Sequence, residues 1–319
     1  MQQTEALVSG NAASPAERAR LMRHASYASV AVAFLLIAAK IVAYLLTGSV
    51  ALLSSMLDSL LDAGASIVNL VAIRQSLTPA DREHRFGHGK AEPLAAVGQA
   101  AFIAGSAAFL AFQAVGRLIT PVPVEHGGFG IAVMLFSIAA TAALVLYQRH
   151  VIRRTGSFAI RADSLHYFGD LFVNVSVIAA LLLTMWRGWT SADPLFAIGI
   201  AAYILYTAWQ IFRGALDMLM DRELPDEIRT RIRQIALAEP RVKSVHDLRT
   251  RAAGTAIFVQ MHLEMDPDMA LRDAHEAADA VEVAIMAAFP GAEVIIHEDP
   301  AGVEEARRPF ERPAMTRRT

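Results

Sequence analysis

The chain has 319 residues, of which 55% are hydrophobic and 19% are charged, and its mean hydropathy is +0.38. This composition is too apolar for an ordinary pair of soluble domains and indicates a membrane protein. The formal net charge of -2 argues against nucleic acid as a partner. The sequence has no cysteine, so any metal ion has to be bound by oxygen and nitrogen atoms, which favours Zn²⁺, Fe²⁺, Co²⁺, Mn²⁺ or Cd²⁺ over Cu⁺.

The polar N-terminus is followed by six apolar stretches. Residues 1–25 lack the apolar centre and small-residue cleavage site of a signal peptide, so we expect a cytoplasmic N-terminal segment. Each apolar stretch within residues 26–220 is about long enough to cross the hydrocarbon core at 1.5 Å per residue. The sequence therefore predicts a membrane domain of six transmembrane helices, at Ser26–Leu46, Val50–Ile73, Ala91–Ile119, Gly128–Tyr147, Ala159–Trp186 and Pro194–Met220.

The positive charges between the stretches predict the orientation. They gather in the loop after the second stretch and in the loop after the fourth, at Arg74, Arg82, Arg85, Lys90, Arg149, Arg153, Arg154 and Arg161. The loops on the opposite side carry little positive charge. Because positively charged loops stay in the cytoplasm, we expect both termini on that side.

Two apolar stretches carry ionisable residues at helical spacing. Asp58 and Asp62 lie one turn apart in the second stretch, and His166 and Asp170 repeat the spacing in the fifth. A charged side chain at the bilayer centre costs at least about 2.5 to 3.5 kcal/mol, so a partner has to offset the cost. Three carboxylates and one imidazole suit a divalent metal ion. A buried polar network that only packs helices is the alternative.

The surroundings of these residues repeat as well. The pattern Asp-Ser-Leu-x3-Gly-x3-Val-Asn occurs at Asp58–Asn69 and at Asp163–Asn174, on stretches that run in opposite directions, although two matches of a short pattern are also compatible with coincidence. If the repeat is real, it pairs the two stretches around a midplane site. Lys40 in the first stretch is ambiguous, and Asp163 is expected to cap the cytoplasmic end of the fifth.

A second cluster lies in the loop after the second stretch. Asp81, His84 and His88 stand in a glycine-containing segment and can gather around one metal ion. A solvated charged loop explains the same residues equally well, because short loops with histidine are common.

Residues 221–300 have the composition of a soluble domain. The pattern predicts the order α-β-β-α-β, a small α+β domain, with elements at Pro225–Ala238, Lys243–Arg251, Thr255–Met265, Met269–Phe289 and Ala292–Glu298. The tail, residues 301–319, is rich in arginine and glutamate and is expected to be disordered.

The soluble domain contains a third cluster. Of the ten histidines in the chain, four fall in this domain, and with one aspartate they form a candidate metal site: His246, His262, His275, His297 and Asp299. His297 and Asp299 share one face if the last strand continues through both. Ordinary surface histidines are the alternative.

Several motifs resemble the cation diffusion facilitator family of metal/proton antiporters, and most closely its bacterial zinc and ferrous-iron efflux branch. The similarity covers nearly the whole chain, and its most specific segments are Leu57–Ser66, Phe86–Glu92, Arg161–Tyr167, His246–Arg251 and Val294–His297. The resemblance implies a multi-pass protein of the bacterial inner membrane, in contact with lipid, that exports a divalent cation in exchange for protons.

The resemblance also implies roles for the clusters. Asp58, Asp62, His166 and Asp170 would bind the transported ion, and Asp81, His84 and His88 would match the family's loop site. His246, His262, His275, His297 and Asp299 would hold structural Zn²⁺ in a metallochaperone-like domain of a homodimer. Lys90 and Asp221 would form charged contacts at the dimer interface. Since zinc-restricted members often carry histidine at the position of Asp58, Fe²⁺ and Cd²⁺ stay open beside Zn²⁺ as substrates.

Two other functions are compatible with the residues alone. One is an intramembrane metalloenzyme that activates a bound water molecule, and the other is a membrane-bound metal sensor. The enzyme needs an open coordination position and a separate general base. The strong candidates are all used as metal ligands, so transport is the preferred interpretation.

Overall fold

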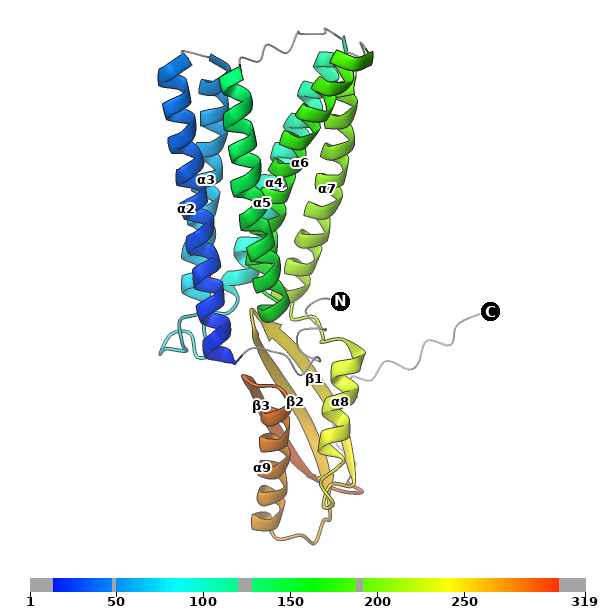
Figure 1. Ribbon diagram of the computed structural model, residues 1–319. Helices are drawn as coiled ribbons and strands as arrows, with labels where there is room; N and C mark the ends of the chain where they lie inside the picture. The colour runs from blue at the N-terminus through cyan, green and yellow to red at the C-terminus, as the bar shows by residue number, and fades with distance from the viewer. Residues whose placement is uncertain (1–13, 48–49, 120–127, 188–191, 304–319) are drawn as a thin grey trace, which may run out of the picture.

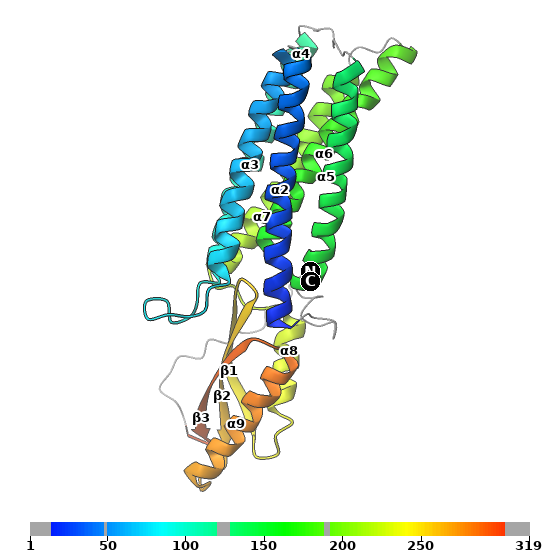
Figure 2. The ribbon, with the colours of Figure 1, turned by 60° about the vertical axis from the view of Figure 1, so that its left-hand side comes forward.

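The computed structural model of the protein describes residues 14–47, 50–119, 128–187 and 192–303. These residues form two parts, a bundle of long helices and a small domain at one end of it (Figure 1). The two parts stay distinct when the molecule is turned, so the protein is elongated along the bundle axis (Figure 2). Most of the predicted tail, from residue 304 onward, lies outside the described residues.

The bundle contains six long helices in the described part of the chain: α2 (Pro15–Thr47), α3 (Val50–Ser76), α4 (Ala91–Ile119), α5 (Gly128–Thr155), α6 (Phe158–Arg187) and α7 (Ala192–Leu219). Four of them, α2, α4, α5 and α7, are long and apolar enough to cross a membrane by length and composition. The helices α3 and α6 have a similar length but carry ionisable residues, among them Asp62 on α3 and His166 and Asp170 on α6. The structure thus supports a transmembrane domain with four candidate spans, fewer than the six expected.

Several helices extend beyond the apolar stretches at the end nearest the small domain. Helix α2 begins at Pro15, so residues 15–25, expected as part of a separate segment, continue the first predicted span. Pro15 and Glu17 in the first turn suit a helix N-terminus, where a missing N–H is harmless and negative charge is favourable. Hydropathy detects only the apolar part of such a helix, which explains the difference.

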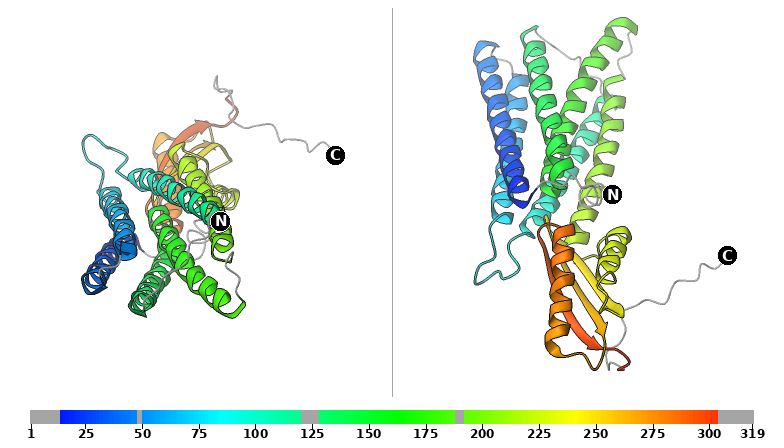
Figure 3. Two further views of the ribbon diagram at one scale, coloured as in Figure 1. Left: turned by 90° about the horizontal axis from the view of Figure 1, so that it is seen from above. Right: turned by 60° about the horizontal axis from the view of Figure 1, so that its bottom comes forward.

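The helices pack mainly in pairs. Helix α4 packs along α7, α2 packs along α3 and α5, and α6 packs along α5 and α7. Seen along the bundle axis, α2 and α3 form one edge of the domain (Figure 3). A cluster of fully buried side chains joins α2, α3, α5 and α6 near the small domain: Met22, Ala25, Ile73, Val151, Ala159 and Ile160. Large apolar side chains such as Phe112 are exposed on the outside of the bundle, a feature that fits a domain with helices long and apolar enough to cross a membrane.

The small domain follows the predicted order of elements. It consists of α8 (Asp226–Ala236), β1 (Ser244–Ala253), β2 (Ala256–Met265), α9 (Leu271–Ala288) and β3 (Ala292–Pro300). The strand order is β1-β2-β3, with β1 antiparallel to β2 and β2 parallel to β3. The structure confirms the general layout of a membrane domain followed by a small domain with a sheet.

One face of this sheet packs against the two helices. Val259 and Leu263 of β2 are fully buried in one core with Ile232 of α8 and Ile285 of α9. Burying each such side chain contributes about 1.5 to 3 kcal/mol. The alternate residues of β2 therefore lie on the opposite face, which neither α8 nor α9 covers.

The two parts meet at a close backbone contact. A Cβ atom on Gly89 would overlap the carbonyl oxygen of Ala253, and Gly254 in the turn between β1 and β2 has a φ of +61°. Beside this contact, Lys90 Nζ lies 3.0 Å from Asp221 Oδ1. Within one protomer this ion pair links the loop before α4 to the segment after α7. The expected contact of these two residues at a dimer interface stays a prediction.

Candidate metal centres

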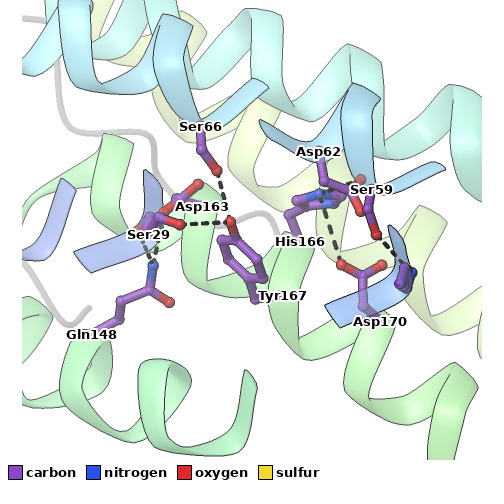
Figure 4. Close-up of polar contacts among 10 residues, drawn as sticks. Ser29, Ser59, Asp62, Ser66, Gln148, Asp163, His166, Tyr167 and Asp170 are labelled. Carbon is purple, nitrogen blue, oxygen red and sulfur yellow. Dashed lines mark hydrogen bonds and ion pairs between the residues drawn. The ribbon is translucent and has the colours of Figure 1, made fainter. Parts of the chain in front are cut away.

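The first candidate site lies between α3 and α6 inside the bundle. His166 Nε2 lies 3.0 Å from Asp62 Oδ1 and 3.8 Å from Asp170 Oδ2 (Figure 4). One ligand atom from each of the three residues lies within 4.8 Å of the others. The imidazole of His166 is 5% exposed, and the ring of Phe102 packs against it edge-on with the centroids 5.7 Å apart. This donor set, one nitrogen and two carboxylates, is one that divalent cations accept.

The three residues lie at matching depths. Asp170 is twelve residues after the start of α6, and Asp62 is twelve residues after the start of α3, which begins at the opposite end of the bundle. Each is therefore about 18 Å along its helix at 1.5 Å per residue, close to the middle of the bundle. Asp58 stands one turn before Asp62 on α3, but its side chain lies outside the described residues.

A buried polar network adjoins the site toward the small domain. Ser29 Oγ donates to Asp163 Oδ2 at 2.5 Å, and Gln148 Nε2 donates to the same oxygen at 2.7 Å. Tyr167 donates its hydroxyl proton to the Ser29 carbonyl oxygen and lies 2.8 Å from Ser66 Oγ (Figure 4).

The position of Asp163 corrects the expectation that it caps a helix end. It is fully buried in the bundle, where it ties α6 to α2 and α5. The sequence contained no signal for this, because its two partners are neutral side chains on other helices, 134 and 15 positions away in the chain.

The second candidate site is the loop between α3 and α4. His84 Nδ1 lies 3.4 Å from Asp81 Oδ1, and His88 Nε2 lies 3.4 Å from Asp81 Oδ2. The backbone N–H groups of His84 and Glu83 donate to Asp81 Oδ1 at 2.6 and 2.9 Å. These donors, the one of His84 first, stabilise the carboxylate and lower the pKa of Asp81 below its usual value. The loop thus holds two imidazoles around one ionised carboxylate.

The third candidate site lies on the open face of the small sheet. The pairing register sets His246 on β1 opposite His262 on β2, and His262 opposite His297 on β3, so three histidines form a row across the strands. Asp299 lies beside this row, with Oδ2 2.6 Å from His262 Nδ1 and 3.5 Å from His246 Nε2. Its other oxygen, Oδ1, lies 3.2 Å from His297 Nε2. One carboxylate therefore contacts all three imidazoles.

The fourth histidine of this domain does not join the row. His275 lies on α9 and is exposed, and its closest carboxylates belong to Asp279 at 3.5 Å and Glu298 at 4.0 Å. Because α9 covers the other face of the sheet, the strands separate His275 from Asp299 within one protomer. The sequence grouped it with the others because histidine content alone does not distinguish the two faces.

A further carboxylate belongs near this row. Glu264 Oε1 lies 3.6 Å from His246 Nδ1. Glu264 is absent from the cluster predicted from the sequence, although its position two residues after His262 on the same strand implies the same face. Glu264 therefore adds an acidic group to the edge of the cluster.

Comparisons with known families agree with the two-part organisation. A family model described as the cation efflux transmembrane domain matches residues 26–220, and one described as the cytoplasmic domain of cation efflux proteins matches residues 224–301. The chain belongs to the cation diffusion facilitator family of cation efflux proteins. Its similar relatives are named cation-efflux pumps, so this cation efflux protein is a transporter and not an enzyme.

The similar relatives include cation-efflux pumps named FieF. The one from Klebsiella pneumoniae subsp. pneumoniae is 48% identical over 287 residues, which are 90% of this chain and 95% of the relative. The one from Escherichia fergusonii is 49% identical over 284 residues, which are 89% of this chain and 94% of the relative. Among solved structures, the Zn form of CzrB is 38% identical, with a TM-score of 0.25, over 27% of this chain and 98% of that chain.

Proposed function

We propose that this cation efflux protein exports a divalent metal cation from the cytoplasm in exchange for protons. The proposal is carried by the convergence of Asp62, His166 and Asp170 in the middle of the bundle. Intramembrane ionisable residues of this kind usually mark a transport pathway. Asp58 completes the proposed four-ligand set.

The same groups provide the coupling to protons. Carboxylates and a neutral imidazole bind a metal ion only after they have released their protons, so metal entry releases protons and metal exit allows protons to return. If the site opens alternately to the two sides of the membrane, the two flows are exchanged. The pairing of α2 with α3 and of α4 with α7 is compatible with helix groups that move as units.

The donor types bear on the choice of substrate. Three carboxylates and one imidazole suit Zn²⁺ and also the more oxygen-preferring ions, so we include Fe²⁺, Cd²⁺, Co²⁺ and Mn²⁺ as candidate substrates. The FieF relatives are named only as cation-efflux pumps, a description that supports export without naming a metal.

We infer that all six long helices span the bacterial inner membrane in contact with lipid. The residues that lower the hydropathy of α3 and α6 are those that would face the transport path rather than lipid. Both termini then lie in the cytoplasm, an orientation supported by the arginine-rich loops next to the small domain.

The small domain is proposed to bind resident metal and to support a homodimer. His246, His262, His297 and Asp299 fit Zn²⁺, because imidazole nitrogens and a carboxylate are its usual ligands without cysteine. Bound Zn²⁺ would offset the negative charge that Asp299 and Glu264 bring to this uncovered face. The loop site at Asp81, His84 and His88 is proposed to bind a further ion at the same end of the bundle.

The test is metal uptake into inverted vesicles or proteoliposomes under an imposed pH gradient. We expect uptake to accelerate when the lumen is acidic and to fall when a protonophore removes the gradient. Comparison of Zn²⁺, Cd²⁺, Fe²⁺, Co²⁺ and Mn²⁺ in the same preparation identifies the substrates. A rate of metal uptake that does not depend on the pH gradient would exclude protons as the exchanged ion. A lack of uptake for every metal tested would exclude export.

A further inference from the structure

The charged side chain of Lys40 ends inside the bundle at the level of the metal ligands. Its Nζ donates to Ser59 Oγ at 2.6 Å, so α2 and α3 are joined by this bond. Ser59 is 4% exposed and stands directly after Asp58 and three residues before Asp62. Figure 4 draws Ser59 beside Asp62 on α3. The ammonium group therefore reaches the stretch of α3 that carries the proposed ligands.

The direction of this side chain is unusual for a lysine in a membrane helix. Lys40 lies seven residues before the end of α2, about 10 Å from it, so its side chain has the length to extend toward the nearby membrane surface. It extends the other way, to Ser59, which lies nine residues and about 14 Å from the start of α3 at the same end. An ammonium group at this depth is costly unless polar or negatively charged groups lie next to it.

The candidate metal site supplies that charge. Asp62 and Asp170 converge on His166, which can neutralise at most one of the two carboxylates. Residues three apart on a helix have Cβ atoms about 5 to 6 Å apart, so an ammonium group on Ser59 lies in the field of Asp62. Lys40 therefore offsets the negative charge of the site before metal binds, and repels a divalent cation that enters it.

We propose that Lys40 is an affinity-setting residue of the transport site, whose fixed positive charge weakens metal binding and speeds metal release. The inference rests on the proposed function and deepens it. A transporter has to release its substrate at the far side, and four ligands with three carboxylates would hold a divalent ion tightly. The fixed charge lowers the affinity without removing a ligand.

The test is the concentration dependence of Zn²⁺ uptake into proteoliposomes containing the Lys40→Met variant. Methionine keeps an unbranched side chain of similar length and removes the charge. We expect the KM for Zn²⁺ to fall about tenfold and the maximal rate to fall with it, because unit charges a few ångströms apart interact strongly where water is excluded. Damage to the packing of α2 against α3 would have the opposite effect on KM and raise it.

Two further variants separate the charge from the hydrogen bond. Lys40→Arg keeps the charge and should keep the KM within about twofold of the wild-type value, since about 1.4 kcal/mol is needed for a tenfold change. Ser59→Ala removes the hydrogen bond and leaves the ammonium group, so it should also stay close to wild type. Lys40→Gln replaces Lys40→Met if the latter does not insert, with the same expected fall in KM.

The outcomes are distinguishable from those of the proposed function. Wild-type protein without saturable uptake overturns the transport proposal and this inference with it. Saturable wild-type uptake with an unchanged or raised KM in folded Lys40→Met overturns the role of Lys40 alone. A fall in KM that Ser59→Ala or Lys40→Arg reproduces overturns it as well, because the charge is then not the cause.

Discussion

Tyr167 joins α6 to α3 through its hydroxyl oxygen, which lies 2.8 Å from Ser66 Oγ. Because the single phenolic proton is donated to the Ser29 carbonyl oxygen of α2, the Ser66 hydroxyl is the donor in this contact. Ser66 stands one turn after Asp62, and Tyr167 stands next to His166. The bond therefore fixes the spacing of the two helices directly beside the residues that form the candidate metal site.

The first prediction concerns Tyr167→Phe, which removes this hydroxyl and keeps the ring. We expect a loss of about 1 to 3 kcal/mol of stability, because buried polar partners are left unpaired, and a several-fold rise in the KM for metal. Thermal unfolding of the purified protein and metal uptake measure the two effects. Tyr203→Phe on the exposed surface of α7 is the control, and equal behaviour of the two variants would contradict the role of the Ser66 contact.

The second prediction is that Asp62→Ala abolishes metal uptake in protein that still inserts and dimerises. The change removes a carboxylate 3.0 Å from His166 Nε2 and also an intramembrane charge. Uptake should fall to the level of empty vesicles. Asp217→Ala, an exposed carboxylate near the end of α7, is the matched control and should retain uptake. Normal flux through well-folded Asp62→Ala would remove this residue from the site.

The third prediction concerns metal selectivity and the variant Asp58→His. The change converts a set of three carboxylates and one imidazole into two of each, which suits tetrahedral Zn²⁺. We expect Zn²⁺ uptake to persist and most Cd²⁺ or Fe²⁺ uptake to be lost. Paired uptake of Zn²⁺ and Cd²⁺ in the same vesicles at one pH gradient measures the ratio. An unchanged ratio would mean that helix packing, not ligand type, sets the selectivity.

The fourth prediction separates the histidines of the small domain. Asp299→Ala and His246→Ala should lower the bound metal and weaken the dimer, because the Asp299 carboxylate contacts His246, His262 and His297. His275→Ala should lower the metal content less, since His275 lies on the other side of the sheet. Metal analysis and size-exclusion chromatography measure both quantities. Wild-type metal content in Asp299→Ala would show that the row is not a metal site.

The fifth prediction tests the contact between the bundle and the small domain. Gly89→Ala introduces a Cβ atom that overlaps the Ala253 carbonyl oxygen, so the loop or the hairpin has to move. We expect a destabilisation of about 1 to 3 kcal/mol and increased proteolysis between the two parts. Gly98→Ala is the matched control, because a Cβ atom there meets nothing within 4 Å. Equal stability of the two variants would contradict the close contact.

The sequence alone determined the two-part organisation and the three clusters of residues that are candidate metal ligands. Apolar stretches of membrane length predicted the long helices, and alternating patterns predicted the order of elements in the small domain, because both signals are local and repeat with the period of the backbone. The spacing of His166 and Asp170 predicted that they share one helix face, and the structure has them on one side of α6 facing Asp62. The first predicted span began eleven residues after the start of α2, since a polar helix end has no hydropathy signal.

Only the tertiary structure decided which residues meet across elements. The strand register places His246, His262 and His297 in one row. His275 lies on α9 at the other face of the sheet, although all four are histidines of one domain. Asp163 was expected to cap a helix end, but it is buried at the centre of a hydrogen-bond network with Ser29 and Gln148. Such contacts join residues of different helices and strands, from 15 positions apart for Gln148 and Asp163 to 134 for Ser29 and Asp163. They depend on how the elements pack, which the local pattern of either partner does not contain.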